Sequence, residues 1–289
     1  MITPLVWNYN EVYHLSETGA RGSESTMQTL EKLRAIFAEQ ERIHATFPSI
    51  ERMVTSHTIR SVDRGGGRGF VIWSDLGGLS DDQIDAVIEA EKAYFTGQNQ
   101  AFEWKVYRED PPVNLVDRLI AHGFEAEEWE TLLVCELDTV QPRLFDGRGH
   151  RVERVTDAAG IDEVVTVEEA VWGPDERELD DWLHRLMADS SDRFRLYLVR
   201  DGEMAVGAAW MTVTPGSEFG SLWGGSVRPE YRGRGVYGAL LAARAGEARR
   251  MGLRYLMIDA GSMSLPIVEA HGFVRLSESI PCVYTPPGT

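Results

Sequence analysis

The sequence predicts a mixed α/β protein made of two tandem copies of one domain, each with a mostly antiparallel central sheet flanked by helices. The chain has 289 residues, which suits about two domains of ~150 residues each. The tetrapeptide Ala-His-Gly-Phe occurs at 121–124 and again at 270–273, an offset of 149 residues. The elements expected around the two copies follow the same order, so we interpret the halves as a duplication.

Apolar spacing in the first half predicts alternating helices and strands. Residues 26–45 carry apolar residues at helical spacing, and residues 49–76 have the character of strands interrupted by a glycine-rich turn at 64–69. The elements expected next are a helix at 80–95, a strand at 101–110, a helix at 112–123 and a strand at 131–138.

A linker is expected at 138–150, which contains Pro and Gly but no periodicity. The two domains are therefore expected over 1–140 and 148–289. The second half predicts a strand at 150–157, helices at 159–172 and 176–189, strands at 194–202, 205–214 and 218–227, a helix at 236–252, a strand at 253–260, a helix at 264–272 and a strand at 273–285. Both halves thus end in strand, helix, strand, helix, strand.

Composition excludes several classes of protein. The net charge of −17 disfavours nucleic acid and anionic membranes as partners and favours a cationic substrate, unless it serves only solubility. No apolar run approaches the ~18 residues of a membrane span, and residues 1–17 lack a signal-peptide pattern. Two cysteines, Cys135 and Cys282, exclude a disulfide framework. We expect a cytoplasmic monomer or homodimer with buried thiols.

The segment 226–241, "SVRPEYRGRGVYGALL", is the most informative stretch. A strand ends, Pro229 stops it, and a turn rich in Gly and Arg opens a helix. The first-turn N–H groups of a helix have no partner within it, and with the helix dipole they form an anion site suited to a pyrophosphate. Arg232 and Arg234 can add charge-assisted hydrogen bonds. The alternative is a surface turn with solvated arginines.

This segment resembles the acetyl-CoA motif of the GCN5-related N-acetyltransferases, Gln/Arg-x-x-Gly-x-Gly/Ala. Arg232 and Gly235 match the motif, and Tyr237 stands where the family has a small residue. The preceding Val227 and Pro229 also resemble the family, and the likeness covers about 150–285. It implies two tandem domains of this fold, and acetyl-CoA as co-substrate with no metal.

The resemblance also implies the contacts of the cofactor. The fourth and fifth strands of that fold splay apart around the pantetheine arm, and the N–H of Val227 would polarise the thioester carbonyl. The residues expected to bind the cofactor are Gly225, Ser226, Val227, Arg232, Gly233, Arg234, Gly235, Val236, Tyr237, Gly238 and Ser264.

The corresponding turn in the first half has no arginine. It contains Gly77 and Gly78, but Asp75, Asp81 and Asp82 stand where phosphates would lie. Like charges would repel CoA there, so we expect the first copy to keep the fold and to lack the cofactor.

The usual proton donor of the family is missing. Val268 replaces a tyrosine on the last helix, and Gly261 replaces an asparagine seven residues earlier. Ser264 is the hydroxyl we predict to protonate the leaving thiolate. A helix cap is the other role open to this serine.

The general base is less well marked. The family often places a glutamate where this chain has Ser221, and Glu218 and Asp259 are the nearest candidates. Glu168 and Glu169, on the first helix of the second half, are alternatives. His271 recurs as His122 in the first copy, which favours a role at the helix C-terminus over catalysis.

The function expected is therefore transfer of acetyl from acetyl-CoA to an amine of a small molecule, by direct attack. The layout is similar to that of mycothiol synthases, which implies a small metabolite as acceptor. The alternative is a non-catalytic protein that senses or carries acyl-CoA. Release of free thiol in the presence of amines distinguishes the two.

Overall fold

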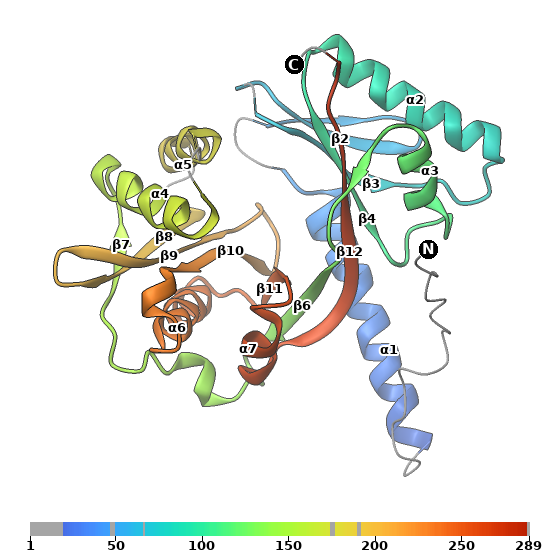
Figure 1. The fold of residues 1–289 in the computed structure, drawn as a ribbon. Helices are drawn as coiled ribbons and strands as arrows, with labels where there is room; N and C mark the ends of the chain where they lie inside the picture. Colours follow the sequence, from blue (N-terminus) through green and yellow to red (C-terminus); the bar gives the residue numbers. More distant parts are fainter. Residues whose placement is uncertain (1–19, 47–49, 66, 174–176, 190–191, 288–289) are drawn as a thin grey trace, which may run out of the picture.

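The protein is described by a computed structural model over residues 20–46, 50–65, 67–173, 177–189 and 192–287. Its strands form one continuous sheet in the order β1-β2-β3-β4-β12-β6-β11-β10-β9-β8-β7, with β5 paired to β12 (Figure 1). The sheet is antiparallel except between β3 and β4 and between β10 and β11. The predicted fold class is confirmed.

The helices and strands follow the predicted order. The strands are β1 Ile50–Val54, β2 Thr58–Asp63, β3 Gly69–Ser74, β4 Phe102–Tyr107, β5 Glu125–Ala126, β6 Glu130–Glu136, β7 Val152–Val155, β8 Phe194–Asp201, β9 Met204–Thr212, β10 Phe219–Val227, β11 Tyr255–Ala260 and β12 Val274–Tyr284. The helices are α1 Ala20–Phe37, α2 Asp81–Gly97, α3 Leu115–Ala121, α4 Ala158–Trp172, α5 Arg177–Asp189, α6 Val236–Arg250 and α7 Leu265–Ala270.

Besides the two-residue strand β5, three short helical elements of the described chain were not predicted. A π-helix, η1 Ala38–Ile43, continues α1, a 3₁₀ helix, η2 Pro142–Phe145, lies inside the expected linker, and another, η3 Pro229–Tyr231, follows β10. The apolar spacing predicts one helix over residues 26–45. In the structure the hydrogen bond from the His44 N–H to the Glu39 carbonyl reaches back five residues, one more than in an α-helix. This wider turn changes which side chains of η1 face the protein.

The last strands of the two halves are exchanged. β6 from the first half pairs with β11 of the second half, and β12 from the second half pairs with β4 of the first half. We call β1–β5 with β12, α2 and α3 the first lobe, and β6–β11 with α4–α7 the second lobe. Figure 1 shows β12 running from α7 into the first lobe, where the C-terminus lies beside α2. The expected domains, 1–140 and 148–289, divide the chain by sequence. That residues 140–148 separate two folded units stays a prediction.

The helices cover both faces of the sheet, and the alternating direction of side chains along the strands shows which face each helix covers. Leu133 and Ile258 face α6 and α7, and Trp104 faces α2 and α3, all on one side of the sheet. Leu132 faces α1, and Leu196 faces α4 and α5, on the other side. Because successive side chains of a strand point to opposite faces, α1, α4 and α5 share the face of the sheet that holds the cavity described below.

Residues 148–289 alone should be aggregation-prone or inactive. Without β6, the fragment loses the antiparallel partner of all six residues of β11, and an unpaired apolar edge strand is a template for association. Size-exclusion chromatography and activity of this fragment beside the full chain check the expectation. A soluble fragment with full activity would contradict it.

None of the described helices combines the length and the apolar character that crossing a membrane requires. Cys135 and Cys282 are free and buried. The start of the chain, where no signal peptide is expected, lies outside the described residues.

Candidate active site

Strands β10 and β11 diverge in the middle of the second lobe. They pair in parallel only from Phe219 with Tyr255 to Ser221 with Met257, although β10 runs on to Val227 and β11 to Ala260. Beyond these three pairs the backbone edges of both strands are free to receive a ligand.

A β-bulge adds to the opening on β10. Gly224 pairs with Ala209 and Ser226 with Ala208, so Gly225 is the extra residue, whose backbone is left unpaired in a bulge. Gly225 has a φ of 84°, and a Cβ there would lie 2.8 Å from the ring of Tyr237. The side chain of Ser226 is engaged internally, since its Oγ donates to Glu168 Oε2 at 2.8 Å.

The turn after β10 leaves the start of α6 uncapped. Gly235 is the N-cap, with a φ of 88° and no side-chain hydrogen bond to the helix. The first-turn N–H groups are therefore available to an anion. Arg232 and Arg234 are exposed beside them; Arg232 Nε donates to the Val227 carbonyl at 3.3 Å, and the Arg234 guanidinium lies 4.8 Å from the Tyr231 ring centre.

The expected linker also contributes to this helix N-terminus. A Cβ on Gly238 would lie 3.7 Å from both Arg148 Nε and His271 Nε2, and His150 Nε2 lies 2.8 Å from the Arg234 carbonyl. His271 Nε2 is buried and has no hydrogen bond among the described residues. Arg148 and His150 could not be predicted here, because residues 138–150 show no periodicity.

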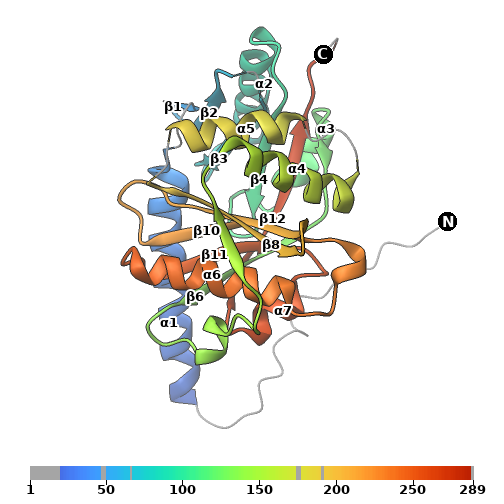
Figure 2. The same ribbon diagram turned by 90° about the vertical axis from the view of Figure 1, so that its left-hand side faces the viewer.

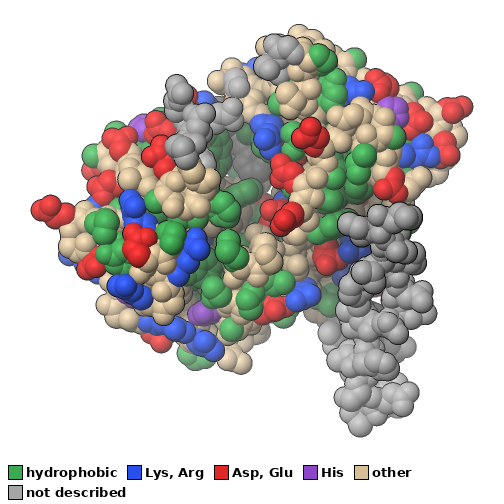
Figure 3. All heavy atoms as spheres, viewed as in Figure 1, with side chains coloured by type: hydrophobic (Ala, Val, Ile, Leu, Met, Phe, Trp, Pro, Cys, Tyr) green, Lys and Arg blue, Asp and Glu red, His purple; other side chains and the backbone are tan. Residues whose placement is uncertain are grey.

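A cavity of about 450 Å³ lies between the lobes, where Figure 3 shows a hollow with acidic side chains beside it. Its floor is the sheet face that also carries α1, and it continues into the gap between β10 and β11. The lining includes Leu222, Trp223 and Gly224 of β10, Ile258 and Asp259 of β11, Tyr237 of α6 and Ser264, together with Trp182 and Leu186 of α5. A ligand held at the α6 N-terminus can thus reach the cavity through the gap.

Helix α5 closes the cavity from the second lobe to the first. Arg185 Nη2 donates to Asp63 Oδ2 of β2 at 3.1 Å, and Figure 2 shows α5 extending across toward β1 and β2. The cavity is therefore built by both lobes.

Glu41 of η1 is a buried carboxylate in this cavity, with 7% of its surface exposed. It accepts hydrogen bonds from Thr214 Oγ1 at 3.3 Å, from Ser221 Oγ at 3.5 Å and from Ser217 Oγ. Burial raises its pKa from 4.5 to about 6, although the three hydroxyls act in the opposite direction. The first half thus brings a carboxylate to Ser221, the position where the resembling family often has glutamate.

The predicted catalytic residues are only partly brought together. Ser264 and Asp259 line the cavity, whereas Glu218 does not; Glu218 accepts a hydrogen bond from Gln40 Nε2 at 3.0 Å and is 43% exposed. Asp259 Oδ2 pairs with Lys105 Nζ at 2.6 Å. Ser264 makes no cap hydrogen bond to α7, and its Oγ donates to the Gly261 carbonyl at 3.3 Å.

The equivalent gap of the first lobe is filled. Strands β3 and β4 also pair in parallel over only three residues, ending at Val71 and Trp104. Beyond that point Arg42 Nε donates to the Ile72 carbonyl at 2.8 Å, and the guanidinium makes two hydrogen bonds, of 2.9 and 2.7 Å, to Asp110. The Arg42 side chain therefore occupies the backbone edge that is free in the second lobe.

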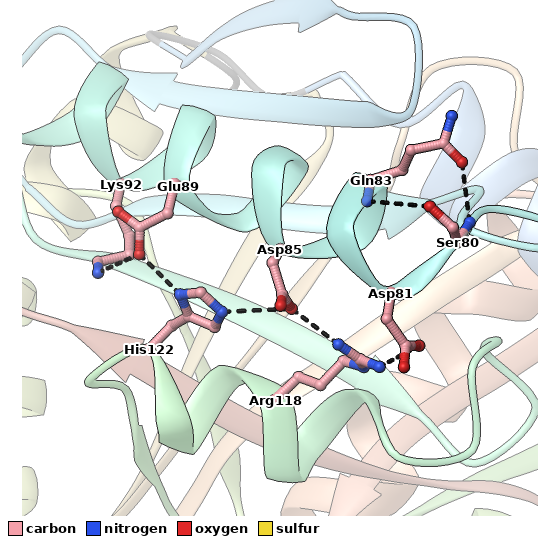
Figure 4. Close-up of polar contacts among 8 residues, drawn as sticks. All are labelled: Ser80, Asp81, Gln83, Asp85, Glu89, Lys92, Arg118 and His122. Carbon is pink, nitrogen blue, oxygen red and sulfur yellow. Dashed lines mark hydrogen bonds and ion pairs between the residues drawn. The ribbon is translucent and has the colours of Figure 1, made fainter.

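The start of α2 is closed as well, as Figure 4 shows. Ser80 and Gln83 form a capping box, which satisfies first-turn N–H groups from within the chain. Arg118 pairs with Asp81 and with Asp85, and its Nη1 lies 2.8 Å from Asp85 Oδ1. The His122 ring lies between Asp85 and Glu89, at 3.3 and 2.7 Å. These contacts give His122 a structural role at the end of α3.

Replacing Arg42 with methionine should destabilise the protein by about 3–5 kcal/mol, because Asp110 is left as an unpaired buried charge. Both side chains are buried, at 7% and 6% exposure. Denaturant unfolding measures the change. The matched control, Arg64→Met, removes an exposed pair with Glu51 and should cost less than about 1 kcal/mol. Equal losses in the two variants would refute this.

One group of described residues offers metal-ligand atoms close together. Ligand atoms of Asp162, Asp180 and His184 lie within 4.8 Å of one another. They stand on α4 and α5 outside the cavity lining, and His184 Nδ1 lies 3.0 Å from the Asp180 carbonyl. No other feature of the part of the chain that the structure describes points to an ion at this group, and we assign none.

Comparison with known proteins agrees with the geometry. Residues 161–273 match the family model of the acetyltransferase (GNAT) family, and no curated protein is significantly similar to this chain. A GCN5-related N-acetyltransferase from Kribbella flavida has 14% identity and a TM-score of 0.62, with 93% of this chain and 95% of that chain covered. A GCN5-related N-acetyltransferase from Sphaerobacter thermophilus has 17% identity and a TM-score of 0.55, with coverages of 81% and 78%.

A third similar structure is a tandem GNAT protein from the clavulanic acid biosynthesis pathway. It has 14% identity and a TM-score of 0.55, with 94% of this chain and 98% of that chain covered. At these identities the structures establish the fold, including its tandem form. The family match over residues 161–273, which include the splayed strands and the α6 turn, shows that the second half carries a domain of the acetyltransferase (GNAT) family, whose members are acyltransferases.

Proposed function

We propose that this protein transfers an acetyl group from acetyl-CoA to an amine of a small molecule. The observation that carries the proposal is the opening of the β10–β11 gap into a cavity that holds the buried carboxylate of Glu41. A thioester threaded through the gap from the α6 N-terminus would meet the acceptor there. Each half then has a role, since the second lobe holds the cofactor and η1 supplies a proton acceptor.

The pyrophosphate would be held at the start of α6. The uncapped N–H groups, Arg232 and Arg234 offer it hydrogen bonds and positive charge. Arg148 approaches the same turn at Gly238. A cationic side chain beside the positive end of a helix dipole is unfavourable unless an anion lies between them, which fits a phosphate group.

The reaction would proceed by direct attack. Glu41 takes a proton from the amine, the nitrogen attacks the thioester carbonyl carbon, and the carbon–sulfur bond breaks to release the thiolate of CoA. A base with a pKa near 6 is ionised at neutral pH and suits this task. Burial raises the pKa of both cysteines to about 12, so neither is a thiolate nucleophile near neutral pH, and direct attack needs none.

Ser264→Ala should lower turnover at least about tenfold, equivalent to ~1.4 kcal/mol, with little change in CoA affinity. The serine lines the cavity without capping α7, and its hydroxyl would turn from the Gly261 carbonyl, 3.3 Å away, to protonate the leaving sulfur. Steady-state kinetics measures both parameters. Tyr237→Phe tests the other hydroxyl of the cavity lining as proton donor, because the Tyr237 hydroxyl has no hydrogen bond among the described residues. Parental turnover in Ser264→Ala would end the assignment.

The proposal is tested by thiol release from acetyl-CoA in the presence of a panel of amines. Release that depends on an amine, with acetylated amine found by mass spectrometry, supports the enzyme. CoA binding without release from any amine would favour a non-catalytic acyl-CoA-binding protein.

A further inference from the structure

The cavity extends well beyond the gap where acetyl transfer is proposed. From β10 its floor crosses β11, β6 and β12 and reaches β4 in the first lobe, where Glu103, Lys105 and Tyr107 line it. Neighbouring strands lie about 4.8 Å apart. β6 is two strand intervals from β10 and β4 is four, so the backbones of these two strands lie roughly 10–19 Å from β10. Their side chains reach back toward it, since Lys105 Nζ contacts Asp259 of β11.

Carboxylates dominate this far wall. It is lined by Glu103, Glu127 and Glu130, together with Lys105. Lys105 Nζ is shared by Asp259 at 2.6 Å and Glu130 at 3.0 Å. Burial alone would lower the pKa of Lys105, but these carboxylates raise it well above its usual value. Two of the three N–H groups of the lysine are therefore engaged by Asp259 and Glu130.

Glu103 lacks a close cation. Its side chain is only 14% exposed, and its cationic contact among the described residues, Arg68 Nη1, is 3.8 Å away; the same nitrogen lies 3.9 Å from Glu127. Neither distance is a hydrogen bond. Within the described part of the chain, no hydrogen bond to the Glu103 carboxylate is found. Burial raises its pKa, and Lys105 and Arg68 only partly offset that effect.

We propose that Glu103, Glu127 and Glu130 form a subsite for a second cationic group of the acceptor, remote from the nitrogen that is acetylated. This rests on the proposed function. A protonated amine or guanidinium would give Glu103 the missing hydrogen bonds and relieve the repulsion among three carboxylates. The acceptor class is thus an elongated diamine or polyamine, whose one end is deprotonated by Glu41 while the other stays charged.

The cavity between the two acidic ends fits a flexible apolar connection. Leu132, Met257 and Pro281 line the floor, and Phe37 and Ile72 stand beside them. Methylene groups bury favourably against such side chains. A carboxylate at the far end of an acceptor would instead meet like charge, which a binding site uses to reject wrong partners.

The test is a matched series of acceptors of one chain length, with a far amine, a far hydroxyl or a far carboxylate, at lengths that span about 10 Å and more. We expect kcat/KM for the diamine to exceed that of the amino alcohol at least tenfold, and kcat/KM for the amino acid to be the lowest of the three. Added salt should reduce the difference between the diamine and the amino alcohol. Equal values for diamine and amino alcohol would overturn the subsite while leaving the acetyltransferase intact. Absence of transfer to every amine would overturn both.

Variants locate the effect. Glu103→Gln with Glu127→Gln should bring the ratio of diamine to amino alcohol close to one. The control Glu125→Gln removes one carboxylate charge from an exposed position on β5 and should keep the ratio. An unchanged ratio in the double variant contradicts the assignment. If that variant does not fold, the parent protein is tested instead, and a diamine preference that salt does not reduce contradicts the assignment.

Discussion

Replacing Glu41 with glutamine is expected to lower kcat/KM for acetyl transfer at least about a hundredfold at neutral pH, since a positioned general base contributes typically 10²–10⁴-fold. Glu41 is the buried carboxylate that η1 holds beside Ser221. Glutamine keeps the size and can keep hydrogen bonds to the surrounding hydroxyls, but it accepts no proton. CoA affinity should change little, because the carboxylate lies away from the α6 turn.

The pH profile provides an independent check. Because burial raises the pKa of Glu41 to about 6, activity should fall tenfold per pH unit below that value. An aryl amine acceptor, which stays neutral over this range, isolates the enzyme's own titration. The residual activity of Glu41→Gln should not show this fall at low pH.

The control is Glu39→Gln, which removes a 61% exposed carboxylate from the same π-helix and should leave kinetics unchanged. If Glu41→Gln behaves like this control, Glu41 is not the base.

Glu41 should also affect stability in the direction opposite to most acids. A carboxyl whose folded pKa is raised favours the folded state below pH 4.5, and this contribution is lost as the pH rises through about 6. Glutamine mimics the neutral form. Glu41→Gln should therefore raise the free energy of unfolding at pH 7 by about 2 kcal/mol, and the gain should vanish below pH 4.5. Denaturant titrations at two pH values measure it.

The second large effect is expected at the α6 turn. Arg232→Glu combined with Arg234→Glu should weaken CoA binding at least about a hundredfold, because each charge-assisted hydrogen bond contributes roughly 1.5–3 kcal/mol and the new carboxylates repel phosphate. Both side chains are exposed, so the fold should survive. Isothermal titration calorimetry measures the affinity.

The matched control reverses the charge of two arginines at the other end of the same helix. These are Arg249 and Arg250, which lie in the last turn of α6. Their replacement by glutamate should leave CoA affinity within about threefold, because charge effects on the dipole fall off within one turn. Comparable losses in both double variants would show that net charge, and not the turn, governs binding.

Local patterns predicted much of the fold. Apolar alternation located the strands, and the Gly-Arg run placed an uncapped helix start after β10, as the structure has it. The exchange of β6 and β12 could not be predicted, because either strand has an apolar pattern that suits the edge of β4 or of β11. Pairing partners are chosen by three-dimensional packing, which the spacing of one strand does not encode.

The site was predicted unevenly for the same reason. Glu41 sits in a segment with ordinary helical spacing, where a glutamate is expected in solvent. It is buried because α1 packs across the sheet through Phe37 and because the π-turn brings Glu41 toward the second lobe while Arg42 enters the first. Likewise Arg148 lies in a segment without periodicity, and only the fold brings it to Gly238.

The most direct test of the central claim, one cofactor site formed by the second lobe and none in the first, is the stoichiometry of CoA binding. Calorimetric titration of the full chain should give one CoA per chain, with binding lost on Arg232→Glu plus Arg234→Glu. This follows from the open gap beside Gly225 and from the Arg42 side chain that fills its counterpart. Two equivalent sites per chain, or one site that survives the double replacement, would contradict it.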